Sequence, residues 1–379
     1  MTRSPAAGGP APLATLLVGA GEMGAVWLRA LVSAKAAALG VRLVGVCDLE
    51  TARAAAALAA CARADGAGPV AVEASLDRAL ALGPDLVIDC TTPNLRLAIT
   101  GAALRHGAHV LCEKPLAADG ATAARLLGLA ARAPGRLAVS QNRRFQPGLR
   151  QMRDAVASGA LGAPQTLHAT LHMAPRMPGF RAAIRHVLLR DMAIHAFDGA
   201  RAILGSDAVS VTCTARSPAG SPFAHGAEAH ALFEMTCGAL FAFSGSWAET
   251  GPPTSWNGAW RLALSDGALR WDGEGEARAW RPAPEGAPGF LPEPVPVPLP
   301  PPREEPSDIL GALASLLAAL REGRAPETGA RDNARSLAMV FAAIESAEAG
   351  GRRVAVRDLA LSADAGEARG ARASERGPA

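Results

Sequence analysis

The chain has 379 residues, about half of them hydrophobic, which is enough to bury more than one core and predicts two domains. Lys and Arg (38) nearly balance Asp and Glu (35), and the arginines are scattered, so nucleic acid is excluded as an expected partner. No apolar run approaches a membrane span and the first residues lack a signal-peptide pattern, so we expect a cytoplasmic protein.

The six cysteines show neither CxxC pairs nor metal-finger spacing. Several lie within apolar runs, where a thiol behaves as a small hydrophobic group. We therefore expect reduced thiols in the core and no metal site. The cysteines are Cys47, Cys61, Cys90, Cys112, Cys213 and Cys237.

Short apolar runs alternate with helical segments up to residue 145. The predicted strands are 14–20, 41–48, 69–72, 85–90, 108–113 and 136–140, and helical spacing of apolar residues occurs at 23–38, 51–63 and 94–106. Repeated strand–helix–strand units are typical of a parallel sheet covered on both faces. We predict an α/β Rossmann domain with a doubly wound sheet over residues 14–145, after a disordered N-terminal segment at 1–13.

The pattern changes beyond a predicted helix at 147–158. Apolar runs at 166–174, 208–215, 228–236, 238–247, 260–265 and 267–273 are separated by turn residues, and only one long helix, 189–204, interrupts them. Hairpin-like spacing predicts a large, mostly antiparallel open sheet in an α+β domain over residues 146–360.

The C-terminal third begins with a proline-rich stretch at 281–306, which we expect to be an extended surface loop. Two helices are predicted after it, at 307–322 with Ser307 as N-cap, and at 332–349. Residues 361–379 are rich in Gly, Ala, Ser and Arg, which predicts a flexible tail.

The segment GAGEMG, residues 19–24, follows the first predicted strand and opens the first predicted helix. Gly19 and Gly21 allow a tight turn and close approach of a pyrophosphate, and Gly24 lets the helix pack on the strand. The helix N-terminus at Glu22 and Met23 offers free amides to the phosphates. A dinucleotide site is therefore predicted here.

Asp48 ends the second predicted strand, where a carboxylate can accept hydrogen bonds from the adenosine ribose hydroxyls. Leu49 and Glu50 supply no cation for a 2′-phosphate, which favours NAD. Arg53, one turn later, keeps NADP possible.

Two motifs end the fourth and fifth predicted strands, CTTPN at 90–94 and CEKP at 112–115. Strand ends of this kind face the ligand crevice of a doubly wound sheet, so we expect both motifs to line the nicotinamide pocket. The expected cofactor contacts are Thr91, Thr92, Pro93, Asn94, Glu113 and Lys114.

A third motif, DMAIHAFD at 191–198, places Asp191 and His195 four residues apart, on one helix face. Taken alone, such a pair is an ordinary helix-surface feature. Together with Lys114 it predicts chemistry, because an imidazole can take the hydroxyl proton while hydride leaves the same carbon. Asp191 would orient the imidazole, and the Lys114 ammonium would stabilise negative charge on the substrate oxygen.

With these residues in place, the chain resembles the glucose-fructose oxidoreductase, inositol dehydrogenase and rhizopine-catabolism (Gfo/Idh/MocA) family. The likeness runs from about residue 14 to 357 and includes GAGEMG, the TPN and EKP motifs, QNRRFQP at 141–147, SGALGAPQ at 158–165 and the DxxxH helix. The resemblance implies catalytic roles for Lys114, Asp191 and His195 and a cofactor contact from Gln141. It also implies a closing helix, 331–349, that packs back near the cofactor domain.

The same resemblance implies a sugar, a sugar derivative or a cyclitol as substrate, and a homodimer or homotetramer formed through the sheet of the C-terminal domain. Two departures from the family pattern put the pocket shape in question. Leu97 stands where the family commonly has histidine, and RHVLLR at 185–190 replaces a usual glycine pair.

Six more residues lie in segments expected to rim the substrate pocket, although each is equally compatible with an ordinary surface position. They are His172, Arg176, Arg181, His186, Trp256 and Asn257. The sequence thus predicts an NAD(P)-dependent dehydrogenase acting on CH–OH groups. Two alternatives stay open: an NAD-dependent redox-assisted glycosidase and a non-catalytic dinucleotide-binding regulator on the same fold.

Overall fold

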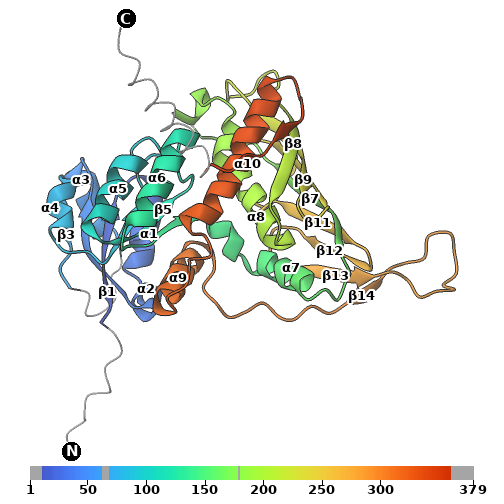
Figure 1. The fold of residues 1–379 in the computed structure, drawn as a ribbon, viewed down its shortest axis with the longest axis horizontal. Helices are drawn as coiled ribbons and strands as arrows, with labels where there is room; N and C mark the ends of the chain where they lie inside the picture. The colour runs from blue at the N-terminus through green and yellow to red at the C-terminus, as the bar shows by residue number, and fades with distance from the viewer. Residues whose placement is uncertain (1–10, 62–67, 178–179, 360–379) are drawn as a thin grey trace, which may run out of the picture. The chain divides into compact units, whose positions relative to one another are not determined.

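The computed structural model describes residues 11–61, 68–177 and 180–359, which divide into two compact units (Figure 1). The first unit contains the chain up to Ser140 and the later segment Ile309–Asp332, and the second contains Gln141–Asp308 and the chain from Asn333 onward. The predicted tail at 361–379 and residues 1–10 of the predicted disordered segment lie outside the described residues. No helix of the described ranges is long and apolar enough to cross a membrane.

The first unit is built on a six-stranded parallel sheet in the order β3-β2-β1-β4-β5-β6. Its strands are β1 (Leu13–Val18), β2 (Val41–Cys47), β3 (Ala71–Glu73), β4 (Leu86–Asp89), β5 (His109–Glu113) and β6 (Leu137–Ser140). The strand order reverses between β1 and β4, which is the switch point where such sheets bind ligands. The predicted doubly wound sheet is confirmed.

Helices connect these strands. They are α1 (Glu22–Leu31), α2 (Ala34–Leu39), α3 (Thr51–Ala59), α4 (Leu76–Leu80), α5 (Arg96–His106) and α6 (Gly120–Arg132). The sequence predicted one helix at 23–38, but the structure has two, because Ser33 is extended and its hydroxyl caps the amide of Ala36. Capping residues favour helix starts, and here one starts a second helix.

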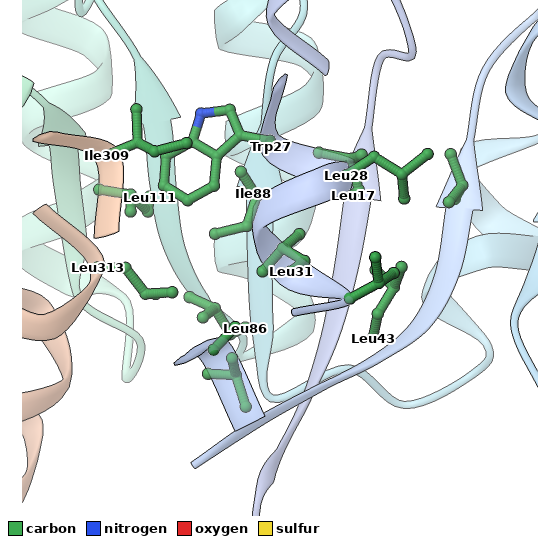
Figure 2. Close-up of a cluster of buried hydrophobic side chains, with 14 of the residues drawn as sticks. Leu17, Trp27, Leu28, Leu31, Leu43, Leu86, Ile88, Leu111, Ile309 and Leu313 are labelled. Carbon is green, nitrogen blue, oxygen red and sulfur yellow. The ribbon is translucent and has the colours of Figure 1, made fainter. Parts of the chain in front are cut away.

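A helix from far along the chain, α9 (Asp308–Arg321), completes the core of the first unit. Its Ile309 and Leu313 lie in the same buried cluster as Trp27 and Leu111 (Figure 2). The sequence predicts this helix, at 307–322, within the second domain. Helical spacing of apolar residues shows that a face is buried, but it does not show which sheet covers that face.

The second unit contains a nine-stranded sheet in the order β14-β13-β12-β11-β7-β10-β9-β8-β15, antiparallel except for the β7–β10 pair. Its strands are β7 (Pro164–His172), β8 (Ala208–Arg216), β9 (Glu228–Met235), β10 (Leu240–Ser246), β11 (Ala259–Leu264), β12 (Gly267–Trp271), β13 (Arg278–Arg281), β14 (Val295–Val297) and β15 (Val354–Ala355). The predicted α+β class is confirmed. The proline-rich stretch predicted as a loop contributes β14, where Pro296 is tolerated because the strand lies at the sheet edge.

The helices of the unit include α7 (Pro147–Ala157), α8 (Ile194–Leu204) and α10 (Ala330–Glu348). The helices α7 and α8 pack on one face of this sheet, and within the described residues the side chains of its other face, such as His230 and Arg261, are exposed. Phe197 of α8 makes edge contacts with Phe233 and Phe243 of the sheet at ring-centroid distances of 4.8 and 5.5 Å. In α10, Ser336 donates a 2.7 Å hydrogen bond to Asp198 of α8, so this closing helix packs within the second unit from Asn333 onward.

All six cysteines are free, as the sequence analysis expected. One of them, Cys237, is exposed rather than in the core, because it lies in the short turn between β9 and β10. The apolar runs on either side of that turn made it look like a core residue.

The packing of α9 on the first sheet predicts a large cost for truncating Leu313. Leu313→Ala should lower the free energy of unfolding by about 2–5 kcal/mol, because Leu313 is fully buried and a cavity would remain. Leu291→Ala, at a largely exposed leucine, should change it by less than about 0.5 kcal/mol. Urea denaturation measures the free energy of unfolding of both variants. Equal losses of this free energy in the two variants would contradict the packing of Leu313 on the first sheet.

Candidate functional site

In the glycine loop after β1, the space beside Gly21 is open, whereas the space beside Gly24 is filled. A Cβ on Gly24 would lie 1.9 Å from the Gly19 carbonyl oxygen, so this glycine is required for α1 to pack against the loop. A Cβ on Gly21 would meet nothing within 4 Å, and no side-chain hydrogen bond caps the first turn of α1. Open space beside uncapped amides fits a pyrophosphate.

Asp48, immediately after β2, is buried with its carboxylate held by three donors. The amides of Ala20 and Glu50 donate at 2.6 and 2.8 Å, and the guanidinium of Arg53 pairs with it at 2.7 Å. Burial alone would raise the pKa of Asp48, but these donors together bring that pKa below its ordinary value. The carboxylate is ionised, and a carboxylate accepts about four hydrogen bonds, so it retains capacity for a ribose hydroxyl.

The loop after β4 is held by a fully buried ion pair that was not predicted from the sequence. Arg96 of α5 pairs with Asp89 at the end of β4 at 2.8 Å, and it donates to the Thr91 carbonyl at 3.1 Å. The Thr91 hydroxyl donates to Asp89 at 2.6 Å. These bonds hold the predicted cofactor contacts of this loop at the carboxyl end of β4, where Thr92 and Asn94 are exposed.

The end of β5 is tied to the first helix through another buried carboxylate. The indole N–H of Trp27 donates to Glu113 at 2.7 Å. Burial raises the pKa of Glu113, and the opposing effects of Trp27 and the neighbouring Lys114 only reduce that shift. Lys114 is half-buried and precedes a cis peptide bond to Pro115. The glycine loop, Asp48 and both strand-exit motifs thus occupy the carboxyl edge of one sheet.

In the second unit, His195 is buried near the start of α8, and its ring is contacted by the side-chain amide of Gln141. The side-chain nitrogen of Gln141 lies 3.4 Å from His195 Nδ1 and donates to the Ile194 carbonyl at 3.3 Å. Asn333 donates to the Gln141 side-chain oxygen at 3.1 Å. Because the Ile194 carbonyl only accepts, it fixes which end of the Gln141 amide faces His195. Gln141, predicted as a cofactor contact, is engaged with the histidine helix.

Asp191 lies in a π-helical turn, Leu188–Ala193, rather than in the α-helix that its spacing from His195 assumed. Its carboxylate accepts a 3.0 Å hydrogen bond from Arg181, and both side chains are partly exposed. A π-turn changes the angular spacing of side chains, and such turns are frequent at functional sites. Sequence spacing alone could not reveal it.

A small hollow lies beside His195 within the second unit. Its lining includes Arg143, Thr170, Asn257 and Trp260, and its volume of about 20 Å³ is room for one water or one substrate oxygen. Asn257 is thus the one pocket candidate predicted from sequence that shares this hollow with His195. Arg143 and Thr170 were not predicted as pocket residues.

The arginine doublet after β6 has two different environments. Arg144 is buried and pairs with Asp198 of α8 at 2.6 Å. The Arg143 guanidinium makes no hydrogen bond or ion pair with the residues that the structure describes, although the side chain is half-buried. Burial lowers the pKa of Arg143 to about 10, opposed by the charges of Asp308 and Asp191, so it stays protonated at neutral pH. A doublet in the sequence could not show which arginine faces the hollow.

The remaining predicted pocket residues lie elsewhere. His172 contacts Glu249 at 2.6 Å, and His186 contacts Glu348 of α10 at 3.1 Å. Neither lines the hollow beside His195, nor do the two exposed candidates, Arg176 and Trp256.

Comparison with known proteins gives matches to both parts of one family. The model described as "Oxidoreductase family, NAD-binding Rossmann fold" matches residues 13–141, and the model of the GFO/IDH/MocA C-terminal domain matches residues 149–270. Together these matches cover most of the chain.

Curated relatives include an inositol 2-dehydrogenase of Streptomyces avermitilis, 33% identical over 60% of this chain, and one of Rhizobium meliloti, 34% identical over 52%. The matched part spans 64% and 57% of those proteins, which is less than two thirds. An oxidoreductase from Agrobacterium radiobacter, solved with NAD⁺, L-tartaric acid and magnesium, has a TM-score of 0.75 at 21% identity, covering 91% of this chain and 98% of that one. That likeness shows the fold.

The lowered pKa of Asp48 predicts a pH effect on stability. A carboxylate with a lower pKa in the folded state stabilises the protein above its unfolded pKa, near 4, and this stability is lost as the pH falls through the folded pKa. Asp48→Asn should therefore lose less stability than wild type between about pH 5 and pH 3. Thermal midpoints across this range measure it. Glu276→Gln, at an exposed carboxylate, should follow wild type, and an unchanged slope in Asp48→Asn would refute the assignment.

Proposed function

Because the chain belongs to the Gfo/Idh/MocA family of oxidoreductases, we propose that it is an NAD-dependent dehydrogenase that interconverts a hydroxyl and a carbonyl on a sugar, sugar derivative or cyclitol. The observation that carries the proposal is the hollow shared by His195, Arg143 and Asn257. It joins a proton-handling ring, a protonated guanidinium and an amide, which are groups that recognise a substrate rich in oxygen atoms.

The first unit supplies the cofactor half of this proposal. The open space at Gly21 would take the pyrophosphate, and Asp48 would accept from the adenosine ribose. NAD is favoured over NADP because Arg53 is paired with Asp48 and Glu50, at 2.7 and 2.9 Å. When bound, NAD supplies the hydride acceptor, which this chain's side chains cannot provide.

Three residues carry the proposed chemistry. His195 takes up the hydroxyl proton as the C–H bond breaks in oxidation, and it returns that proton to the carbonyl oxygen in reduction. The Lys114 ammonium stabilises negative charge on the same oxygen. Asp191 supports the charged form of the imidazole. This assignment rests on the family motifs and on the buried position of His195.

Several of the relatives are named inositol dehydrogenases, which favours a cyclitol among the proposed substrate classes. Arg143 adds sugar acids to these classes, because a guanidinium donates to a hydroxyl and also pairs bidentately with a carboxylate. The first experiment is therefore a panel of cyclitols, aldoses, polyols and sugar acids, followed by absorbance of the reduced nicotinamide with NAD and NADP in parallel. Release of an aglycone without net NADH would favour the redox-assisted glycosidase instead.

We also propose that the chain forms a homodimer or homotetramer through the open face of the second sheet. Three large apolar side chains on β8, β9 and β10 support this: Val209, Leu232 and Leu240 are 46%, 46% and 39% exposed. An apolar patch of this kind on a sheet face is typical of an interaction surface. Sedimentation of the full chain tests it.

The catalytic assignment predicts large losses at two positions. His195→Asn and Lys114→Met should each lower kcat by about two to four orders of magnitude, because each removes a group that acts on the reacting oxygen. NADH binding, followed by its fluorescence, should persist. Lys35→Met, at an exposed lysine of α2, is the matched control and should keep wild-type turnover. Turnover within a factor of two of wild type in both test variants would refute the roles.

Arg143 is predicted to act on substrate affinity. Arg143→Gln should raise KM by about tenfold or more, which corresponds to the loss of one hydrogen bond from a charged donor. Arg176→Gln is a control, since Arg176 is exposed and outside the hollow. Steady-state kinetics with the best substrate of the panel measures both. If KM is unchanged in Arg143→Gln, the guanidinium does not contact substrate.

A further inference from the structure

The guanidinium of Arg181 holds Asp191, one of the three residues proposed for catalysis. Its Nε donates to Asp191 Oδ2 at 3.0 Å, and the two side chains are each 23% exposed. The sequence predicts Arg181 only as a residue at the rim of the substrate pocket. A cation bound to a carboxylate offsets part of the field that the carboxylate exerts on a third group, so Arg181 changes what Asp191 does to its neighbours.

Backbone hydrogen bonds hold the segment that carries Arg181. The Ala224 amide donates to the Ala182 carbonyl at 2.9 Å, and the Leu188 amide donates to the Gly226 carbonyl at 3.1 Å. Both ends of the segment between Arg181 and the π-turn are thus bonded to the loop that joins β8 to β9. The ion pair with Asp191 therefore forms from a backbone that is held in place, and it does not depend on the side chains alone.

The negative charge of Asp191 reaches the hollow beside His195. This charge opposes the lowering of the Arg143 pKa by burial, and Arg143 lines the hollow together with His195. The π-turn that carries Asp191 also runs directly into α8. A nearby carboxylate favours the imidazolium form of a histidine, and a cation bound to that carboxylate opposes the effect.

Other charged groups near His195 come from the π-turn itself and from the turn after β6. Arg190 lies on the π-turn. Arg143 lines the hollow and is affected by the charge of Asp308 as well as by that of Asp191. Arg144 is buried in an ion pair with Asp198 at 2.6 Å, so this pair adds little net charge.

The remaining elements packed on α8 and the π-turn direct their titratable side chains elsewhere. On α7, Arg150 pairs with Glu305 at 3.4 Å. The strands β7 and β9 carry their titratable side chains on the sheet face opposite to these helices, and these are His168, His172, Glu228, His230 and Glu234. Removing the Arg181 charge therefore changes the charge balance around Asp191 directly.

We propose that Arg181 sets the pH at which His195 exchanges its proton, by offsetting part of the Asp191 charge. The inference rests on the proposed dehydrogenase function, in which neutral His195 accepts the hydroxyl proton during oxidation. An uncompensated Asp191 would keep the imidazole protonated to a higher pH. The Arg181–Asp191 pair lowers that pH and leaves more neutral His195 available near pH 7. Arg181 acts through Asp191 and is a positioning residue.

An NMR titration of the histidine signals of the full chain tests this without substrate or cofactor. The His195 signal is identified by its loss in His195→Asn. In Arg181→Gln it should titrate about half a pH unit or more above wild type, because the Asp191 charge is then uncompensated. Arg181→Lys keeps a cation and should titrate close to wild type. Arg185→Gln is the matched control, because this exposed arginine of the same segment pairs with Glu348 instead.

The pH dependence of kcat/KM for oxidation gives a second readout. Its fall at low pH reports protonation of the base in the free enzyme, so in Arg181→Gln this fall should move to higher pH by the same amount as the NMR midpoint. A merely structural role would lower kcat/KM at every pH and leave the midpoint of the fall where it is in wild type.

Three results would overturn the inference: a His195 midpoint in Arg181→Gln that is unchanged or lower, an equal rise in Arg185→Gln, or loss of folding in Arg181→Gln. The last would show that Arg181 is structural, because partly exposed ion pairs contribute little stability, and thermal midpoints detect it. A rise of the His195 midpoint without oxidation of any substrate in the panel would refute the dehydrogenase activity and leave the electrostatic role of Arg181 supported.

Discussion

The buried amide of Gln141 is the contact on which the second unit's candidate site depends. It joins His195 on one side to Asn333 on the other, and the Ile194 carbonyl determines its orientation. A histidine that moves a proton must hold its ring in a fixed position, and a buried hydrogen-bonded partner provides this more reliably than an exposed one. Because Gln141 and Asn333 are both fully buried, replacing either would leave a polar group without its partner inside the protein.

Buried polar contacts also hold the carboxyl edge of the sheet in the first unit. The fully buried Arg96–Asp89 pair holds the start of the loop after β4, and Glu113, which accepts from Trp27, directly precedes Lys114 in the chain. Buried ion pairs contribute little net stability, but breaking one is costly, so they specify a loop position. The residues proposed to meet the cofactor are therefore supported by a layer of buried polar contacts.

Much of the fold was predictable from the sequence, because periodicity and strand–helix alternation report which faces are buried. The glycine loop could be assigned from three positions, since steric exclusion at Gly24 requires glycine. The partner of α9 could not be predicted, because Leu313 would fit either sheet. Ser33 shows another limit: a single capping residue divided what the hydrophobic pattern presented as one helix.

The candidate site was less predictable, because it depends on side-chain neighbours far apart in sequence. Asp191 and His195 were identified from their spacing, yet the π-turn changes how Asp191 is placed. Arg143 was visible only as half of a doublet, and Asn333 gave no signal at all. The central claim, hydride transfer from a CH–OH carbon, is tested most directly with a substrate deuterated at that carbon. The account predicts that mass spectrometry finds the deuterium in the NADH formed, and unlabelled nucleotide after substrate turnover would contradict it.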